Sequence, residues 1–144
     1  MKFIADVMLG RLAKRLRLLG FDVLYDRTLD DNELIRLSLE EDRVILTRDT
    51  LLASRPLAKN RLMIEHDLVD DQLRQVFDAL GITAPPGFLT RCSLCNQPLA
   101  AAQKQDVKDL VPEHVYDTRN YFFLCAGCGR VYWKGSHVER MERG

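Results

Sequence analysis

Two pairs of cysteines constrain the fold of this chain more than any other feature. Cys92-Ser-Leu-Cys95 and Cys125-Ala-Gly-Cys128 contain all four cysteines of the sequence. A two-residue spacing lets one tight turn direct two thiolates at the same ion, and two such knuckles supply the four tetrahedral ligands that a structural zinc prefers. Because four cysteines leave no coordination position for water, we expect the zinc to stabilise the C-terminal region and to perform no chemistry.

Two disulfides or a redox-active CxxC are the alternatives for the same cysteines. No apolar run approaches the roughly 20 residues that cross a bilayer. The N-terminal stretch MKFIADVMLG carries an acid where a signal peptide would be apolar. We therefore expect a cytoplasmic protein without a membrane partner, and in that reducing compartment cysteines serve as metal ligands more often than as disulfides.

Length and charge set limits on the function. A chain of 144 residues fits one domain, or one domain with a small appendage, and its 47% hydrophobic and 29% charged residues are typical of a soluble globular protein. The formal net charge is zero. A nucleic-acid site must therefore come from a local patch.

The first half of the chain alternates strand and helix patterns. A helical spacing of leucines begins at Met8 and ends before Gly20, and a capping-box-like Asp30 and Glu33 open a second helix. Strands are expected at 2–5, 23–25, 44–46 and 62–64, and helices at 8–19, 30–42 and 69–80. Strands separated by helices predict a mostly parallel sheet flanked by helices, which is an α/β fold.

A second, smaller unit follows the proline-rich break at 83–87. The composition changes there, because all the cysteines and the single tryptophan lie beyond it. We predict a first domain at 1–87 and a zinc ribbon at 88–144. A short helix at 103–110 would account for the long spacing between the two cysteine pairs.

Acidic side chains stand where the predicted strands end. Asp6 follows the first strand, Asp49 follows the third, and Asp31 opens the second helix. The carboxyl ends of parallel strands share one edge, where ligands bind in such folds. Two carboxylates about 4 Å apart repel by roughly 4 kcal/mol at an effective dielectric of about 20, and a hard cation such as Mg²⁺ offsets that repulsion. The pattern favours a metal site for phosphodiester hydrolysis.

Each acid also has a structural alternative. Asp30 and Glu33 are explained by the capping box, although Glu33 is a candidate additional acid of the site. Asp49 could cap a short helix beginning at Thr50. One of the aspartates at 67–71 could join the acidic cluster, although the role expected of them is to cap the next helix.

Basic and aromatic residues near these features are candidate RNA contacts. One face of the first helix is basic opposite its leucines, a basic residue precedes Asp49, and the tail carries an aromatic-basic stretch. A solvated helix face and packing of the aromatics in a core are the alternatives. The candidates are Arg11, Lys14, Arg15, Arg48, Trp133, Lys134 and His137.

Several motifs together resemble a known family. The stretches FIADVMLGRLAKRLRLLGFDV, DDNELI, VILTRD, RCSLC, CAGC and VYWKGSH resemble, in this order, the Mut-seven C-terminal RNase family, a PIN-like nuclease domain fused to a zinc ribbon. The resemblance implies a Rossmann-type PIN fold and a ribonuclease that depends on Mg²⁺ or Mn²⁺. By position it assigns the catalytic and metal-binding acids to Asp6, Asp31 and Asp49. The zinc ligands that it implies are Cys92, Cys95, Cys125 and Cys128.

Two functions are compatible with these residues. The first is a metal-dependent ribonuclease with a structural zinc ribbon that also contacts RNA. The alternative is a non-catalytic RNA-binding or ribosome-associated module in which the ribbon provides recognition. Turnover that depends on a divalent ion distinguishes the two.

Overall fold

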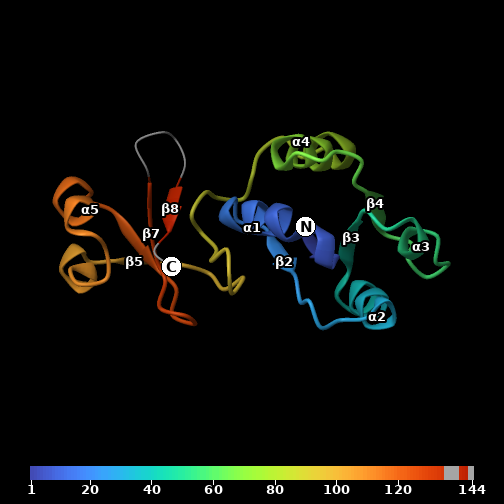
Figure 1. Ribbon diagram of the computed structural model, residues 1–144, viewed down its shortest axis with the longest axis horizontal. Helices are drawn as coiled ribbons and strands as arrows, with labels where there is room; N and C mark the ends of the chain where they lie inside the picture. Colours follow the sequence, from blue (N-terminus) through green and yellow to red (C-terminus); the bar gives the residue numbers. More distant parts are fainter. Residues whose placement is uncertain (135–139, 143–144) are drawn as a thin grey trace.

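The computed structural model describes residues 1–134 and 140–142 and contains two four-stranded sheets (Figure 1). In the first sheet the strands are β1 (Lys2–Ala5), β2 (Asp22–Leu24), β3 (Arg43–Thr47) and β4 (Arg61–Met63). Their order is β2-β1-β3-β4, and every pair is parallel. The predicted α/β fold with a parallel sheet is confirmed, and β1 and β3 are neighbours at its centre.

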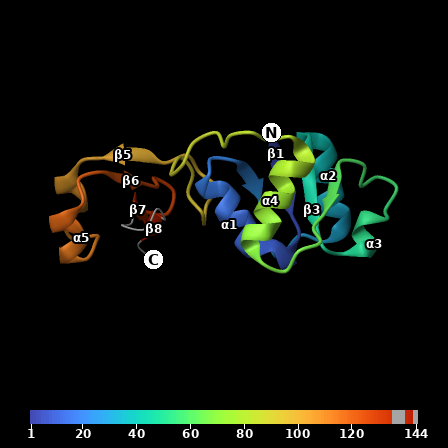
Figure 2. The same cartoon turned by 90° about the horizontal axis from the view of Figure 1, so that it is seen from above.

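Helices cover both faces of this sheet. A 3-10 turn, η1 (Val7–Leu9), leads into α1 (Gly10–Leu18), which packs with α4 (Val69–Leu80) on one face (Figure 2). The other face carries α2 (Asp31–Glu41) and α3 (Thr50–Ala53). The sequence produces this layering because alternate strand residues are apolar on both sides: Phe3 joins the α1 cluster, whereas Ile4 joins the α2 cluster.

The second sheet is antiparallel. It consists of β5 (Ala100–Ala102), β6 (Phe122–Leu124), β7 (Val131–Lys134) and β8 (Arg140–Glu142) in that order. Between β5 and β6 the chain forms a 3-10 turn, η2 (Lys104–Val107), and then α5 (Glu113–Thr118). The single helix predicted at 103–110 is therefore wrong in form, and α5 was missed. Within the described residues, no helix has the length and apolar character needed to cross a membrane.

The segment between the sheets is tied to the end of α1. The backbone N–H groups of Gly87 and Leu89 donate to the carbonyls of Leu19 and Leu18, at 3.0 and 2.8 Å. Gly20 lies here with φ +100°, and a Cβ on it would stand 2.7 Å from the Gly87 carbonyl oxygen. The predicted boundary near residue 87 thus falls in a stretch that is hydrogen-bonded to the first unit.

A shared hydrophobic cluster joins the two units. Leu18 from α1 packs there with Leu89, Cys92, Cys125 and Tyr132, all of them buried. The cysteine region and the parallel sheet therefore bury part of their apolar surface against each other, which favours cooperative unfolding.

Arg17 crosses the same junction. Its side chain is 5% exposed, and its Nε donates to the Val23 carbonyl at 2.9 Å. Its Nη1 donates to the carbonyls of Ser93 at 2.9 Å and Leu94 at 3.2 Å, both inside the first cysteine knuckle. Burial lowers the pKa of Arg17 from its usual value, and the nearby Cys92 opposes that shift.

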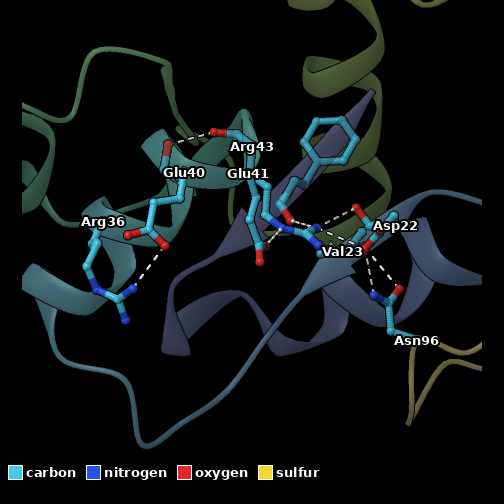
Figure 3. Close-up of polar contacts among 9 residues, drawn as sticks. Asp22, Val23, Arg36, Glu40, Glu41, Arg43 and Asn96 are labelled. Atoms are coloured by element: carbon cyan, nitrogen blue, oxygen red, sulfur yellow. Dashed lines mark hydrogen bonds and ion pairs between the residues drawn. The ribbon is translucent and has the colours of Figure 1, made fainter.

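Asn96 makes a second bridge from the knuckle to the edge strand β2 (Figure 3). Its Oδ1 accepts the Val23 backbone N–H at 3.0 Å, and its Nδ2 donates to Asp22 at 2.7 Å. Asp22 also pairs with the buried Arg43 at 2.9 Å, and Arg43 donates to the Phe3 carbonyl of β1. Although burial alone would raise the pKa of Asp22, the hydrogen bonds from Arg43 and Asn96 lower it.

Candidate functional site

Asp6 and Asp49 are joined by one hydroxyl group at the carboxyl ends of β1 and β3. The Thr47 hydroxyl donates to Asp6 Oδ2 at 2.6 Å and accepts the Asp49 backbone N–H at 2.9 Å. Thr47 is fully buried and Asp6 is 7% exposed, whereas Asp49 is partly exposed. The two predicted acids thus share an edge of the sheet, and Thr47 is a site residue that sequence reasoning missed.

Both acids also hold the start of a helix. Asp6 Oδ1 accepts the Met8 N–H at 2.7 Å and caps η1, while Asp49 Oδ1 accepts the Leu51 N–H at 2.9 Å and caps α3. The alternative prediction, that Asp49 caps a short helix beginning at Thr50, is therefore confirmed. A carboxylate has about four lone-pair positions, so these bonds fix its direction without using all of its acceptor capacity.

Asp31 and Glu33 occupy the first turn of α2, where both are exposed. The capping box is complete: Asp30 accepts the Glu33 N–H at 2.8 Å, and Glu33 Oε1 accepts the Asp30 N–H at 3.2 Å. Asp31 takes no part in the Asp6, Thr47 and Asp49 network within residues 1–134. Across the described chain, the only group of three or more His, Cys, Asp or Glu side chains that could hold a metal ion is formed by the cysteines.

The aspartates at 67–71 do not cap α4, so that prediction is wrong. Leu68 occupies the N-cap position without a side-chain cap hydrogen bond. Asp67 instead pairs with Arg48 Nη2 at 2.9 Å, and Asp70 pairs with Arg15 Nη2 at 2.9 Å. The helix starts because the Gln72 N–H bonds to the Leu68 carbonyl and because acids in its first turn complement the helix dipole.

Four of the predicted basic contacts lie on α1 or directly after β3, and all four are at least partly exposed. Arg11 and Lys14 are exposed on α1, and Arg15 is half-buried beside Asp70. Arg48 directly precedes Asp49, and its Nη1 donates to the His66 carbonyl at 2.9 Å. Its guanidinium is therefore held in place at the rim of the site.

The aromatic-basic tail divides between core and surface. Trp133 is 5% exposed and packs edge-on against Phe122 with ring centroids 6.5 Å apart, which is the core-packing alternative. Lys134 is exposed at the end of β7. His137 lies outside the described residues.

The four cysteines lie close enough together to hold a metal ion. Their Sγ atoms all lie within 4.8 Å of one another, and Cys92 Sγ is 3.7 Å from Cys128 Sγ. Zn–S bonds of about 2.3 Å in a tetrahedron place sulfurs about 3.8 Å apart, so the arrangement fits zinc. Gly129 adopts φ +78° after the second knuckle, in the left-handed region that glycine favours, whereas Gly127 has no positive φ.

Two thiols of the cluster have pKa values that are shifted in opposite directions. A hydrogen bond to Cys128 and then burial raise the pKa of Cys95 to about 12. Burial would also raise the pKa of Cys128, but the Arg130 backbone N–H and the neighbouring thiols lower it to about 7. Metal binding at neutral pH would therefore release protons from the cluster.

Tyr132 supports the first knuckle from behind. This fully buried residue places its hydroxyl 3.1 Å from Cys92 Sγ and 3.0 Å from the Ser93 backbone nitrogen, which donates to it. Burial, followed by the bond to Cys92, raises its pKa well above the usual range. Tyr132 was not predicted as a functional residue, and its aromatic neighbours in the sequence gave no means of singling it out.

Fold and site define an α/β protein with an acid pair at the edge of a parallel sheet and a cluster of four cysteines in its C-terminal region. The chain belongs to the Mut7-C RNAse domain family, whose sequence model matches residues 1–144. The family assignment made from the motifs is confirmed, and it supports a ribonuclease-like function. No significant match was found among curated proteins or among solved structures.

Proposed function

We propose that this protein is a ribonuclease that hydrolyses phosphodiester bonds with Mg²⁺ or Mn²⁺ held at Asp6 and Asp49. The observation that carries the proposal is the Thr47 bridge, which fixes two acids from neighbouring parallel strands in a family of ribonuclease domains. The strand order β2-β1-β3-β4, with acids at the carboxyl ends, supports a PIN-like fold.

The donor set fits a hard cation. Mg²⁺ commonly takes one or two carboxylates and completes its shell with water and substrate phosphate. Asp6 and Asp49 supply two carboxylates whose directions are fixed by helix caps. In this proposal Asp31, at the start of α2, is the third acid, and Glu33 remains the additional candidate.

Each residue has a defined task. When bound, the ion acts as a Lewis acid on the phosphoryl oxygen and lowers the pKa of its water. Asp6 and Asp49 hold the ion, Thr47 orients both carboxylates, and Arg48 binds a phosphate at the rim. The cysteine cluster holds a structural zinc within the ribbon, whose first knuckle Arg17 and Asn96 connect to the nuclease sheet.

The test compares acid variants of the zinc-loaded full chain. Purified protein is incubated with RNA and single-stranded DNA, with Mn²⁺, with Mg²⁺, or with neither. A chelator is avoided because it would also remove metal from the cysteines. Asp6→Asn and Asp49→Asn should lose cleavage and stay folded, since asparagine caps helices about as well as aspartate. Asp31→Asn tests the third acid separately.

Asp78→Asn serves as the matched control, because it makes the same charge change on the exposed, C-terminal part of α4. Cleavage that persists in Asp49→Asn, or without a divalent ion, would remove the acid pair from the mechanism.

A non-catalytic RNA-binding module is the second candidate. The observation in its favour is that Asp6 and Asp49 already act as helix caps, which is a sufficient structural reason for both acids. RNA binding without divalent-dependent turnover, unchanged in Asp49→Asn, would establish this function.

A further inference from the structure

A groove of about 900 Å³ is lined by residues that are neighbours of Asp6 and Asp49 in the sequence. Val7 and Met8, which directly follow Asp6, line it, and so does Arg48, which directly precedes Asp49. Its other wall is the start of α4, which packs along α1 (Figures 1 and 2). The groove thus begins one residue away from each acid along the chain, although neither acid is among its lining residues.

Apolar side chains are unusually exposed on the walls of this groove. The exposed fractions are 53% for Val7, 66% for Met8 and 69% for Leu68. Tyr25 holds the first of these in place, because its hydroxyl donates to the Val7 carbonyl at 2.7 Å. Exposed apolar groups gathered in one groove are typical of a binding surface.

The groove also contains opposite charges that face one another. Four arginines and three aspartates line it. Arg48 is anchored by its bond to the His66 carbonyl while its Nη2 contacts Asp67, and Arg15 reaches Asp70 at the rim. The side chains of Asp67 and Asp70 are 89% and 75% exposed, so these ion pairs are weak and open to competition.

We propose that this groove binds single-stranded RNA, and that Asp67 and Asp70 occupy the phosphate positions of Arg48 and Arg15 until RNA displaces them. A phosphate presents oxygens to a guanidinium in the same way as a carboxylate does. Unpaired bases can lie against Met8 and Leu68, whereas a duplex keeps its base faces stacked inside. This inference rests on the proposed ribonuclease function.

If RNA phosphates displace Asp67 and Asp70 from the two arginines, removing these two carboxylates should increase the affinity for RNA. Fluorescence anisotropy of a short fluorescein-labelled oligouridylate measures affinity for the zinc-loaded full chain. All proteins carry Asp49→Asn and no Mg²⁺ or Mn²⁺ is added, so the RNA stays intact and catalysis plays no part. Asp67→Asn with Asp70→Asn should tighten binding roughly threefold to tenfold.

Two matched variants sharpen the result. Asp78→Asn, on the same helix outside the groove, should change affinity by less than about twofold, because salt screens distant charges. Met8→Ser should weaken binding of the single strand, and a fluorescein-labelled RNA duplex should bind less tightly than oligouridylate. Circular dichroism melts establish that each variant is folded.

Unchanged or weaker binding by the folded double variant would overturn the proposed displacement. Equal affinity for duplex and single strand would overturn the choice of ligand. These outcomes are separable from the proposed function: a protein that cleaves RNA but fails here refutes only this inference. One that binds as expected without ever cleaving RNA refutes catalysis and leaves the groove as a binding site.

Discussion

Replacing Arg17 with methionine should destabilise the whole chain, because one buried guanidinium holds both units. Methionine keeps the aliphatic packing but removes the bonds to the carbonyls of Val23, Ser93 and Leu94. A hydrogen bond to a charged group is worth about 1.5–3 kcal/mol. The cost of burying the charge, which lowers the pKa of Arg17, offsets part of the sum. We therefore expect a loss of about 3–5 kcal/mol, out of a total stability of about 5–15 kcal/mol.

Urea unfolding of the zinc-loaded protein, followed by far-ultraviolet circular dichroism, measures this loss. The midpoint should fall without a change in the slope, and the variant should also lose zinc more readily because two of the three carbonyls lie in the knuckle. Arg36→Met is the matched control, since it removes only an exposed pair with Glu40 and should cost less than about 0.5 kcal/mol. If Arg17→Met unfolds within about 1 kcal/mol of wild type and keeps its zinc, the junction does not depend on this guanidinium.

Three further predictions concern stability. Thr47→Val should cost about 1–3 kcal/mol in thermal unfolding, because it leaves the two acids without their shared hydroxyl, and unchanged stability would contradict the bridge. Hydrogen bonds from Arg43 and Asn96 lower the pKa of Asp22 in the folded state. The stabilisation that the Asp22 carboxylate gives the fold is therefore present above the unfolded pKa of about 3.9 and is lost as the pH falls through the lower folded value. The difference in unfolding free energy between wild type and Asp22→Asn should accordingly shrink on acidification, whereas a constant difference would exclude this linkage. Gly20→Ala should cost more than about 1 kcal/mol, because φ is +100° and the new Cβ would meet the Gly87 carbonyl, and a melt identical to that of wild type would show that this turn adapts.

Patterns with a clear period were predictable from the sequence. The strands and helices of the parallel sheet followed from apolar spacing, and α4 has the predicted bounds, Val69–Leu80. The second unit was harder, because its strands are short and its 3-10 turn and α5 carry no helical repeat. Pro112 precedes α5 at its N-cap position and was a usable signal for its start.

Contacts between side chains that are distant in the sequence could not be predicted from the sequence. The ends of strands predicted where Asp6 and Asp49 lie, but the hydroxyl of Thr47 between them depends on the register of β1 against β3. Capping rules favoured a cap role for Asp67 and Asp70, yet nearby arginines pair with both of them instead. Arg17, between two buried leucines, was a signal for a buried cation, although only the tertiary structure gives its acceptors.

The two bridges from the cysteine knuckle also protect an open sheet edge. In a parallel strand, the N–H and C=O of one residue point to the same side, and on the outer strand β2 both groups of Val23 are already engaged, by Asn96 and Arg17. Unpaired edges recruit strands from other chains, which leads to aggregation. A fragment that ends before the first knuckle would leave this edge of the sheet unpaired. The second unit thus covers a strand edge that could otherwise pair with another chain.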